Sequence, residues 1–179
     1  MTSTAEIYGD SLYDLAVEEN IADTLLSEIH DVDGLFRENP DYLRILREPS
    51  IAKTDRLKLI DDAFSGKIHT YLLNFIKILC GNGTVDEFSS CAKRFTGRYN
   101  DANGISEAKV TSAVELSDNQ KEGLRKKLEE ISGRKIILIE RVDKNMLAGL
   151  KVEIDGKQYD GTASGRIKTI RKQVSDIIV

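Results

Sequence analysis

YNDANGISEAKVTSAV, residues 99–114, contains the point at which this chain changes from one kind of structure to another. Before Gly104, apolar residues recur every three to four positions over long stretches, which is typical of helices that pack on one another. After Gly104 the period becomes two, which predicts a half-buried strand. The residues expected on the buried face of this strand are Ala108, Val110, Ser112 and Val114. We therefore predict an α+β, mainly α protein with a helical domain over residues 1–104 and a small α/β domain over residues 105–179.

The first domain contains six stretches with the 3.6-residue period of an amphipathic helix. They cover residues 4–18, 21–37, 40–49, 55–64, 69–81 and 85–99. Pro40 can begin the third of these helices at its first turn, and Pro49 stops it. Because the connections are short, we predict a six-helix antiparallel bundle.

The second domain reads as strand, helix, strand, hairpin and helix. After the first strand, the predicted elements cover residues 117–133, 135–142, 150–159 and 162–178. Ser117 and Gln120 have the spacing of a capping box at the start of the first of these helices, and Asp155-Gly156 is a turn pair typical of a hairpin.

Three expectations concern side-chain placement in this second domain. The helix at 117–133 should turn Leu124, Leu128 and Ile131 inward. The strand at 135–142 has apolar residues on both faces at its centre, which predicts a central strand. The last helix aligns an apolar stripe made of Ile167, Ile170, Val174 and Ile178.

Composition excludes several classes of protein. The chain has 179 residues, of which 40% are hydrophobic and 31% charged, and this suits one or two soluble globular domains. No apolar run approaches the roughly 20 residues of a membrane-spanning helix, and the first ten residues resemble neither a secretory signal nor a transit peptide. Cys80 and Cys91 are the only cysteines, so we expect a reducing compartment.

Charge is unevenly distributed between the two domains. Residues 1–104 carry 11 Lys and Arg against 18 Asp and Glu, whereas residues 105–179 carry 15 against 12. A strongly acidic half is not expected to bind nucleic acid. Its acidity either keeps a helical surface soluble or attracts a basic or amphipathic partner segment.

No set of residues has the pattern of an active site. The chain lacks a G-x-x-x-x-G-K-[ST] loop and a G-x-G-x-x-G motif after a strand. His30 and His69 are the only histidines, and the two cysteines lack the spacing of a zinc site. We therefore expect no enzyme activity, no cofactor and no metal.

Two classes of function remain open at this point. One is a structural adaptor that grips different partners with its two domains. The other is an RNA- or ribosome-associated adaptor that uses the basic residues of the second domain. These basic residues are Arg125, Lys126, Lys127, Lys168, Arg171 and Lys172. Against the second class, Tyr159 is the only aromatic residue after residue 104, whereas base stacking needs aromatic platforms.

Six short motifs in register along the chain resemble one known family. They are YGDSLYDLA (8–16), LRILREPSIAK (43–53), NFIKILCGNG (74–83), VTSAVELSDNQ (110–120), VDKNMLAGL (142–150) and DGTASGRI (160–167). The chain resembles the delta subunit of bacterial and chloroplast F-type ATP synthases, which is equivalent to the mitochondrial oligomycin-sensitivity-conferring protein. It departs from the family pattern at Thr84, where an arginine is usual, and at Gly9 and Ser11.

The resemblance implies a non-catalytic stator subunit that links the catalytic head to the peripheral stalk. It implies that the first and fifth helices form a groove for the N-terminal helix of an alpha subunit, and that the second domain contacts the b subunit. Carried over, the groove residues are Tyr8, Ser11, Leu12, Leu15, Phe75, Ile78 and Leu79. It also implies a peripheral location on the cytoplasmic face of the bacterial inner membrane, with membrane contact only through the complex. We further expect residues 1–104 to fold alone and residues 105–179 alone to be poorly ordered.

Overall fold

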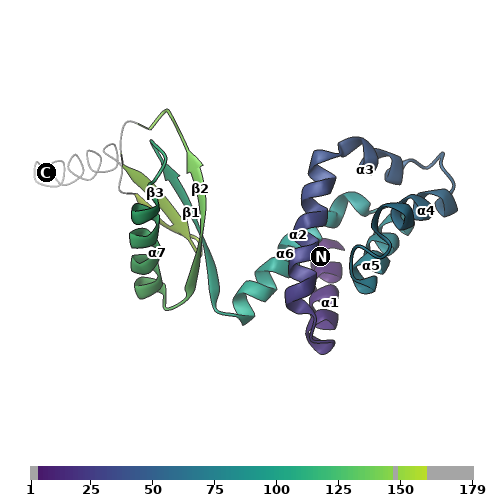
Figure 1. Ribbon diagram of the computed structural model, residues 1–179, viewed down its shortest axis with the longest axis horizontal. Helices are drawn as coiled ribbons and strands as arrows, with labels where there is room; N and C mark the ends of the chain where they lie inside the picture. The colour runs from purple at the N-terminus through teal and green to yellow at the C-terminus, as the bar shows by residue number, and fades with distance from the viewer. Residues whose placement is uncertain (1–3, 147–148, 161–179) are drawn as a thin grey trace, which may run out of the picture. The chain divides into compact units, whose positions relative to one another are not determined.

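The structure, a computed structural model, describes residues 4–146 and 149–160 (Figure 1). The chain divides into two compact units between Asn100 and Asp101, which we call the helical unit and the sheet unit. In the described residues the protein is mainly helical, with seven α-helices and one four-stranded sheet. None of the described helices is long and apolar enough to cross a membrane.

The helical unit contains six α-helices and one 3-10 turn. They are α1 (Thr4–Glu18), α2 (Ala22–Glu38), α3 (Pro40–Arg47), α4 (Lys53–Phe64), α5 (Thr70–Gly81), η1 (Val85–Glu87) and α6 (Phe88–Ala102). Pro40 stands at the start of α3, where its fixed φ suits the first helical turn. After α5, Gly83 adopts a φ of +73°, which glycine tolerates and most residues do not.

One hydrophobic core holds the helical unit together. Its centre includes Phe88 and Phe95, which are almost fully buried. The ring of Phe36 from α2 meets the rings of Phe64 and Phe88 edge-on, at centroid distances of 6.0 and 5.1 Å. Edge-to-face aromatic pairs of this kind add about 0.5–1.5 kcal/mol each to the free energy of burial.

The sheet unit is built from β1 (Ile105–Ser112), α7 (Asp118–Ser132), β2 (Lys135–Val142), β3 (Leu150–Ile154) and β4 (Lys157–Asp160). The strand order is β2-β1-β3-β4, with β1 and β2 parallel and the other pairs antiparallel. The expected capping box of Ser117 and Gln120 is present at the start of α7, and the expected hairpin turn joins β3 to β4. The small core of this unit consists of Ala108, Val110, Leu128, Ile136, Val152 and Ile154.

Three expectations for the sheet unit are wrong. The strand β2 lies at an edge of the described sheet, because it pairs with β1 alone. Ile131 does not face the core and is 67% exposed. Val114 lies beyond the end of β1 and is 71% exposed. The expected last helix at 162–178 lies outside the described residues.

Candidate partner-binding surface

The helices α1 and α5 lie side by side within the helical unit, and their contacts show that they run in opposite directions. At one end, the ring of Tyr8 meets the ring of Phe75 edge-on at 6.4 Å, and Asn82 Nδ2 donates a hydrogen bond to the Tyr8 hydroxyl at 3.0 Å. At the other end, the carboxylate of Glu19, just after α1, raises the pKa of Tyr71.

The seven residues that the resemblance assigned to a groove divide by burial. Leu12, Phe75 and Leu79 belong to the core, with exposed fractions of 5%, 7% and 0%. Tyr8 and Leu15 are partly exposed. Leu12, Phe75 and Leu79 therefore form the packed base of the α1–α5 contact, and Tyr8 packs against this core from its edge.

Ser11 and Ile78 lie on its solvent side. Ser11 is exposed, and Ile78, in the last turn of α5, is 50% exposed, whereas isoleucine is usually buried. We call Tyr8, Ser11, Leu15 and Ile78 the α1–α5 surface. Their contact with a partner stays a prediction, because a surface alone does not identify what covers it.

Sequence reasoning missed two residues beside this surface. Ile7 is 54% exposed, and its carbonyl oxygen accepts a hydrogen bond from Ser11 Oγ at 2.8 Å. Tyr71 is partly exposed at the Glu19 end of the contact. The i,i+4 spacing from Ile7 to Ser11 could have indicated the first, whereas Tyr71 lies outside the family motifs that guided the assignment.

The other side of α1 is held by α6. Arg94 donates two hydrogen bonds to the Asp10 carboxylate, from Nε at 2.7 Å and from Nη2 at 2.9 Å. This bidentate pair lowers the pKa of Asp10. Arg98 bonds to Asp14 at 2.8 Å and lies over the ring of Tyr13, 4.7 Å from its centroid. These contacts fix the rotation of α1 and so determine which of its residues reach α5.

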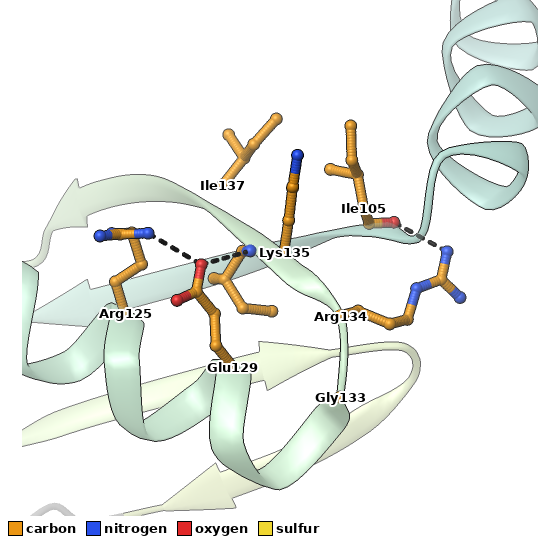
Figure 2. A pocket seen from close by; sticks show the side chains of 8 residues that line it. Ile105, Arg125, Glu129, Gly133, Arg134, Lys135 and Ile137 are labelled. Carbon is orange, nitrogen blue, oxygen red and sulfur yellow. Dashed lines mark hydrogen bonds and ion pairs between the residues drawn. The ribbon is translucent and has the colours of Figure 1, made fainter.

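The sheet unit has a pocket of about 690 Å³ between the end of α7 and the starts of β1 and β2 (Figure 2). Three of its charged side chains, those of Arg125, Glu129 and Arg134, are engaged with protein atoms. The Glu129 carboxylate accepts hydrogen bonds from Arg125 Nη1 at 2.8 Å and from the Ile136 backbone N–H at 3.2 Å. Arg134 Nη2 donates to the Ile105 carbonyl oxygen at 2.8 Å. These bonds join α7, β1 and β2, so these three charged residues have a structural role.

The described residues offer no cluster of three or more His, Cys, Asp or Glu side chains that could hold a metal ion. His30 is exposed, and its Nε2 lies 3.0 Å from Thr96 Oγ1. Cys80 and Cys91 are buried free thiols, and burial raises the pKa of Cys91 to about 11. A thiol with this pKa is almost wholly protonated at neutral pH and is a poor nucleophile.

Comparisons with known proteins agree with the resemblance. A family model described as ATP synthase delta (OSCP) subunit matches residues 4–174. The ATP synthase subunit delta of Lachnoclostridium phytofermentans is 30% identical over 97% of this chain and 96% of that protein. The subunit delta of Prochlorococcus marinus is 28% identical over 98% of each chain.

A solved structure shows the same fold. A chain of the Toxoplasma gondii mitochondrial ATP synthase hexamer superposes with a TM-score of 0.75 over 96% of this chain and 97% of that chain, at 14% identity. The protein is thus of the class of ATP synthase subunits. Within that class, it belongs to the delta (OSCP) subunit family.

Proposed function

We propose that this protein is the stator subunit that links the catalytic head of an ATP synthase to its peripheral stalk, so that the head does not turn with the rotor. Its role is mechanical and non-catalytic. Membership of the delta (OSCP) family supports this proposal. In the complex it is peripheral, on the cytoplasmic face of the bacterial inner membrane, and it touches the membrane only through the other subunits.

In this proposal the helical unit acts as an antiparallel six-helix bundle that binds the N-terminal helix of an alpha subunit at the α1–α5 surface. The observation that carries the site is the exposure of Ile78 beside the partly exposed Tyr8 and Leu15 on two antiparallel helices. An amphipathic guest helix presents apolar anchors at i, i+3 or i+4 and i+7, which fit a surface of this kind.

The sheet unit engages the end of the b subunit. Its core within the described residues is small, and small domains gain stability from association. Several of its isoleucines and valines are exposed, including Ile137, Ile139 and Val142 on β2. This supports a partner contact without identifying the contact residues.

The test of the α1–α5 surface is Ile78→Asp, measured by calorimetric titration with a peptide of the alpha subunit N-terminus from the same organism. A charge at an apolar anchor should weaken binding at least about tenfold, or about 1.4 kcal/mol. Because Ile78 is half-exposed in the free protein, the fold should persist, which circular dichroism can verify. Tyr8→Asp should have a similar effect on binding.

Val17→Asp is the matched control. Val17 is on α1 and is 49% exposed, close to the exposure of Ile78, but nine residues from Tyr8 it points to the opposite side of the helix. It should leave affinity unchanged. If Ile78→Asp and the wild-type protein bind the peptide with equal affinity, the α1–α5 surface is not its binding site.

The second candidate, an RNA- or ribosome-associated adaptor, depends on six basic residues of the second domain, of which Arg125, Lys126 and Lys127 lie on α7 and the others lie outside the described residues. Arg125 is bound by Glu122 and Glu129, and Lys126 lies 3.5 Å from Glu122. Because these two cations are already paired with acidic residues of α7, they are less available to phosphate groups, which favours the stator proposal over the RNA-associated adaptor. Salt-dependent binding to bulk RNA would support the adaptor instead.

A further inference from the structure

The four-stranded sheet presents two different faces. The helix α7 packs against the face that carries the buried residues Ala108 and Val110 (Figure 1). Because side chains alternate along a strand, the residues between them lie on the other face. Figure 2 shows Lys135 and Ile137 of β2 pointing to this second side, away from α7. We call it the open sheet face, formed by alternate residues of β1, β2 and β3 that include Glu107, Ile137 and Lys151.

Two isoleucines of the open sheet face are exposed to solvent. Ile137 and Ile139 of β2 are 48% and 43% exposed, although isoleucine is usually buried. They lie two residues apart on one strand, or about 7 Å. The neighbouring strand β1 is polar here, because Glu107 pairs with Ile137 and Lys109 pairs with Ile139. The open sheet face therefore has an apolar strip along β2 with charged residues beside it.

A hollow of about 270 Å³ lies on the open sheet face, at the Ile139 end of this strip. In the sheet register, Thr111 of β1 is the partner of both Arg141 on β2 and Lys151 on β3. Neighbouring strands are about 4.8 Å apart, so the backbones of these two basic residues are about 10 Å apart. A carboxylate above Thr111 is within reach of both side chains. The hollow is lined by Lys109, Thr111, Ile139, Arg141, Lys151 and Glu153.

The hollow has an excess of positive charge. Lys109 Nζ lies 4.0 Å from Glu153 Oε1, so these two charges offset each other. None of the ion pairs within residues 4–146 and 149–160 of the sheet unit involves Arg141 or Lys151. Two cations beside a hydroxyl group suit a carboxylate, which accepts charge-assisted hydrogen bonds from all three. A partner that covers the apolar strip is therefore expected to be acidic at this end.

The outer edge of β2 is less accessible than the open sheet face. The Ile136 N–H is bonded by Glu129, and the Glu140 side chain is held by Lys121 of α7 at 3.1 Å. A partner strand added to this edge would compete with both contacts, whereas a helix laid on the open sheet face would not. Over its eight residues β2 is about 26 Å long, which a helix of about 17 residues matches.

We propose that the open sheet face binds an acidic amphipathic helix. The apolar stripe of this helix lies on Ile137 and Ile139, and one of its carboxylates enters the hollow above Thr111, between Arg141 and Lys151. The inference rests on the proposed function, in which the end of the b subunit contacts the sheet unit. It gives that contact a face of the sheet, an apolar strip and a charge.

Calorimetric titration of the full-length protein with the soluble part of the b subunit from the same organism tests the apolar strip. Ile139→Asp should weaken binding at least about tenfold, because a charge replaces an apolar anchor. Since Ile139 is 43% exposed, the sheet should stay folded, which circular dichroism can verify. Ile131→Asp is the matched control. Ile131 is 67% exposed on α7, on the other side of the sheet, and its replacement should leave the affinity unchanged.

The double variant Arg141→Gln/Lys151→Gln tests the hollow. It should bind about tenfold more weakly than the wild-type protein at low salt, because two charge pairs are lost. Most of this difference should disappear at about 0.5 M salt, where exposed charges are screened. Lys127→Gln is the control, since Lys127 is an exposed cation on α7. It should change neither the affinity nor its dependence on salt.

Four outcomes would overturn the inference. If Ile139→Asp or the double variant binds like the wild-type protein, the contact lies elsewhere and the proposed function still stands. If only Ile131→Asp weakens binding, the b subunit lies on the α7 side. If the wild-type protein alone forms dimers that Ile139→Asp disrupts, a second copy occupies the open sheet face. If the b subunit does not bind the wild-type protein at all, the proposed function fails together with the inference.

Discussion

Gly9 is placed where α1 meets α6. A Cβ atom built there would lie 2.7 Å from Arg94 Cβ and 2.9 Å from the Cys91 carbonyl oxygen. The second of these is backbone and cannot rotate away. A glycine in a helix costs about 1 kcal/mol relative to alanine, but overpacking a tight contact costs about 1–3 kcal/mol. The steric term is the larger one, and it accounts for a small residue within α1.

Gly9→Ala should therefore lower the free energy of unfolding by about 1 kcal/mol, even though alanine is the better helix former. Urea denaturation followed by circular dichroism measures this. Gly97→Ala on α6 is the control, because a Cβ there meets nothing within 4 Å. It should raise the free energy of unfolding by up to about 1 kcal/mol. If both variants stabilise the protein, the α1–α6 contact accommodates an added methyl group at little cost in free energy.

Asp10 makes the free energy of unfolding depend on pH. Its folded-state pKa lies below the ordinary 3.8 because Arg94 hydrogen-bonds to the ionised form. The unfolded state therefore binds the proton more readily, so the contribution of Asp10 is complete well above pH 3.8 and is lost as pH falls through the lowered pKa. Asp10→Asn should destabilise the protein at pH 7 and have a progressively smaller effect below pH 4. Thermal melts of both proteins from pH 7 to pH 3 would show this, and a constant difference would argue against it.

At the scale of elements, sequence periodicity predicts where the helices lie. It predicts less well how deeply each apolar side chain is buried. The expected first helix, residues 4–18, coincides with α1, and the hairpin at Asp155-Gly156 is as expected. For β2, the apolar run around Ile136 and Ile137 predicts burial on both faces. The structure instead places Ile136 in the core and Ile137 on an open face. Periodicity shows which residues share a face, but not whether anything covers that face.

Prediction of the candidate site from the sequence met the same limit. The motifs indicated α1 and α5, and the contact between Tyr8 and Phe75 shows that they meet. The sequence could not separate Leu79, which is fully buried, from Ile78, which is half-exposed. That distinction depends on how far apart neighbouring helices lie, and local spacing does not contain it.

Glu129 links α7 to the outer edge of β2. The Lys135 N–H bonds to the Gly104 carbonyl oxygen on the β1 side, so the next N–H, that of Ile136, points outward and is bonded by Glu129. Glu129→Ala leaves that donor without its partner and should lower the opening free energy of β2 by about 1–3 kcal/mol. NMR hydrogen exchange at β2 amides measures it. Glu130→Ala, at the exposed neighbouring position, should leave exchange unchanged, and equal effects would argue against a specific bond.

At the scale of the whole molecule, the two units differ in how much core they possess. Within the described residues, the core of the helical unit contains 22 buried residues and that of the sheet unit contains six. Hydrophobic burial is the main favourable contribution to folding, and small cores leave little net stability after the entropy of the chain is counted.

We therefore expect residues 1–104 expressed alone to unfold cooperatively on heating and residues 105–179 alone to be poorly ordered. Calorimetry and proton NMR of the two fragments test this. A sharp calorimetric transition from the fragment 105–179 would contradict it. Failure of the fragment 1–104 to fold would show that the helical unit needs the rest of the chain.

The two buried cysteines make the opening of the helical unit measurable by chemical labelling. Their side chains are buried within it, with exposed fractions of 0% for Cys80 and 1% for Cys91. An alkylating reagent in solution can reach these sulfurs only when the helices separate. The rate at which they become labelled is therefore a measure of how often this half of the protein opens, and a bound partner that holds α1 and α5 together would slow the labelling.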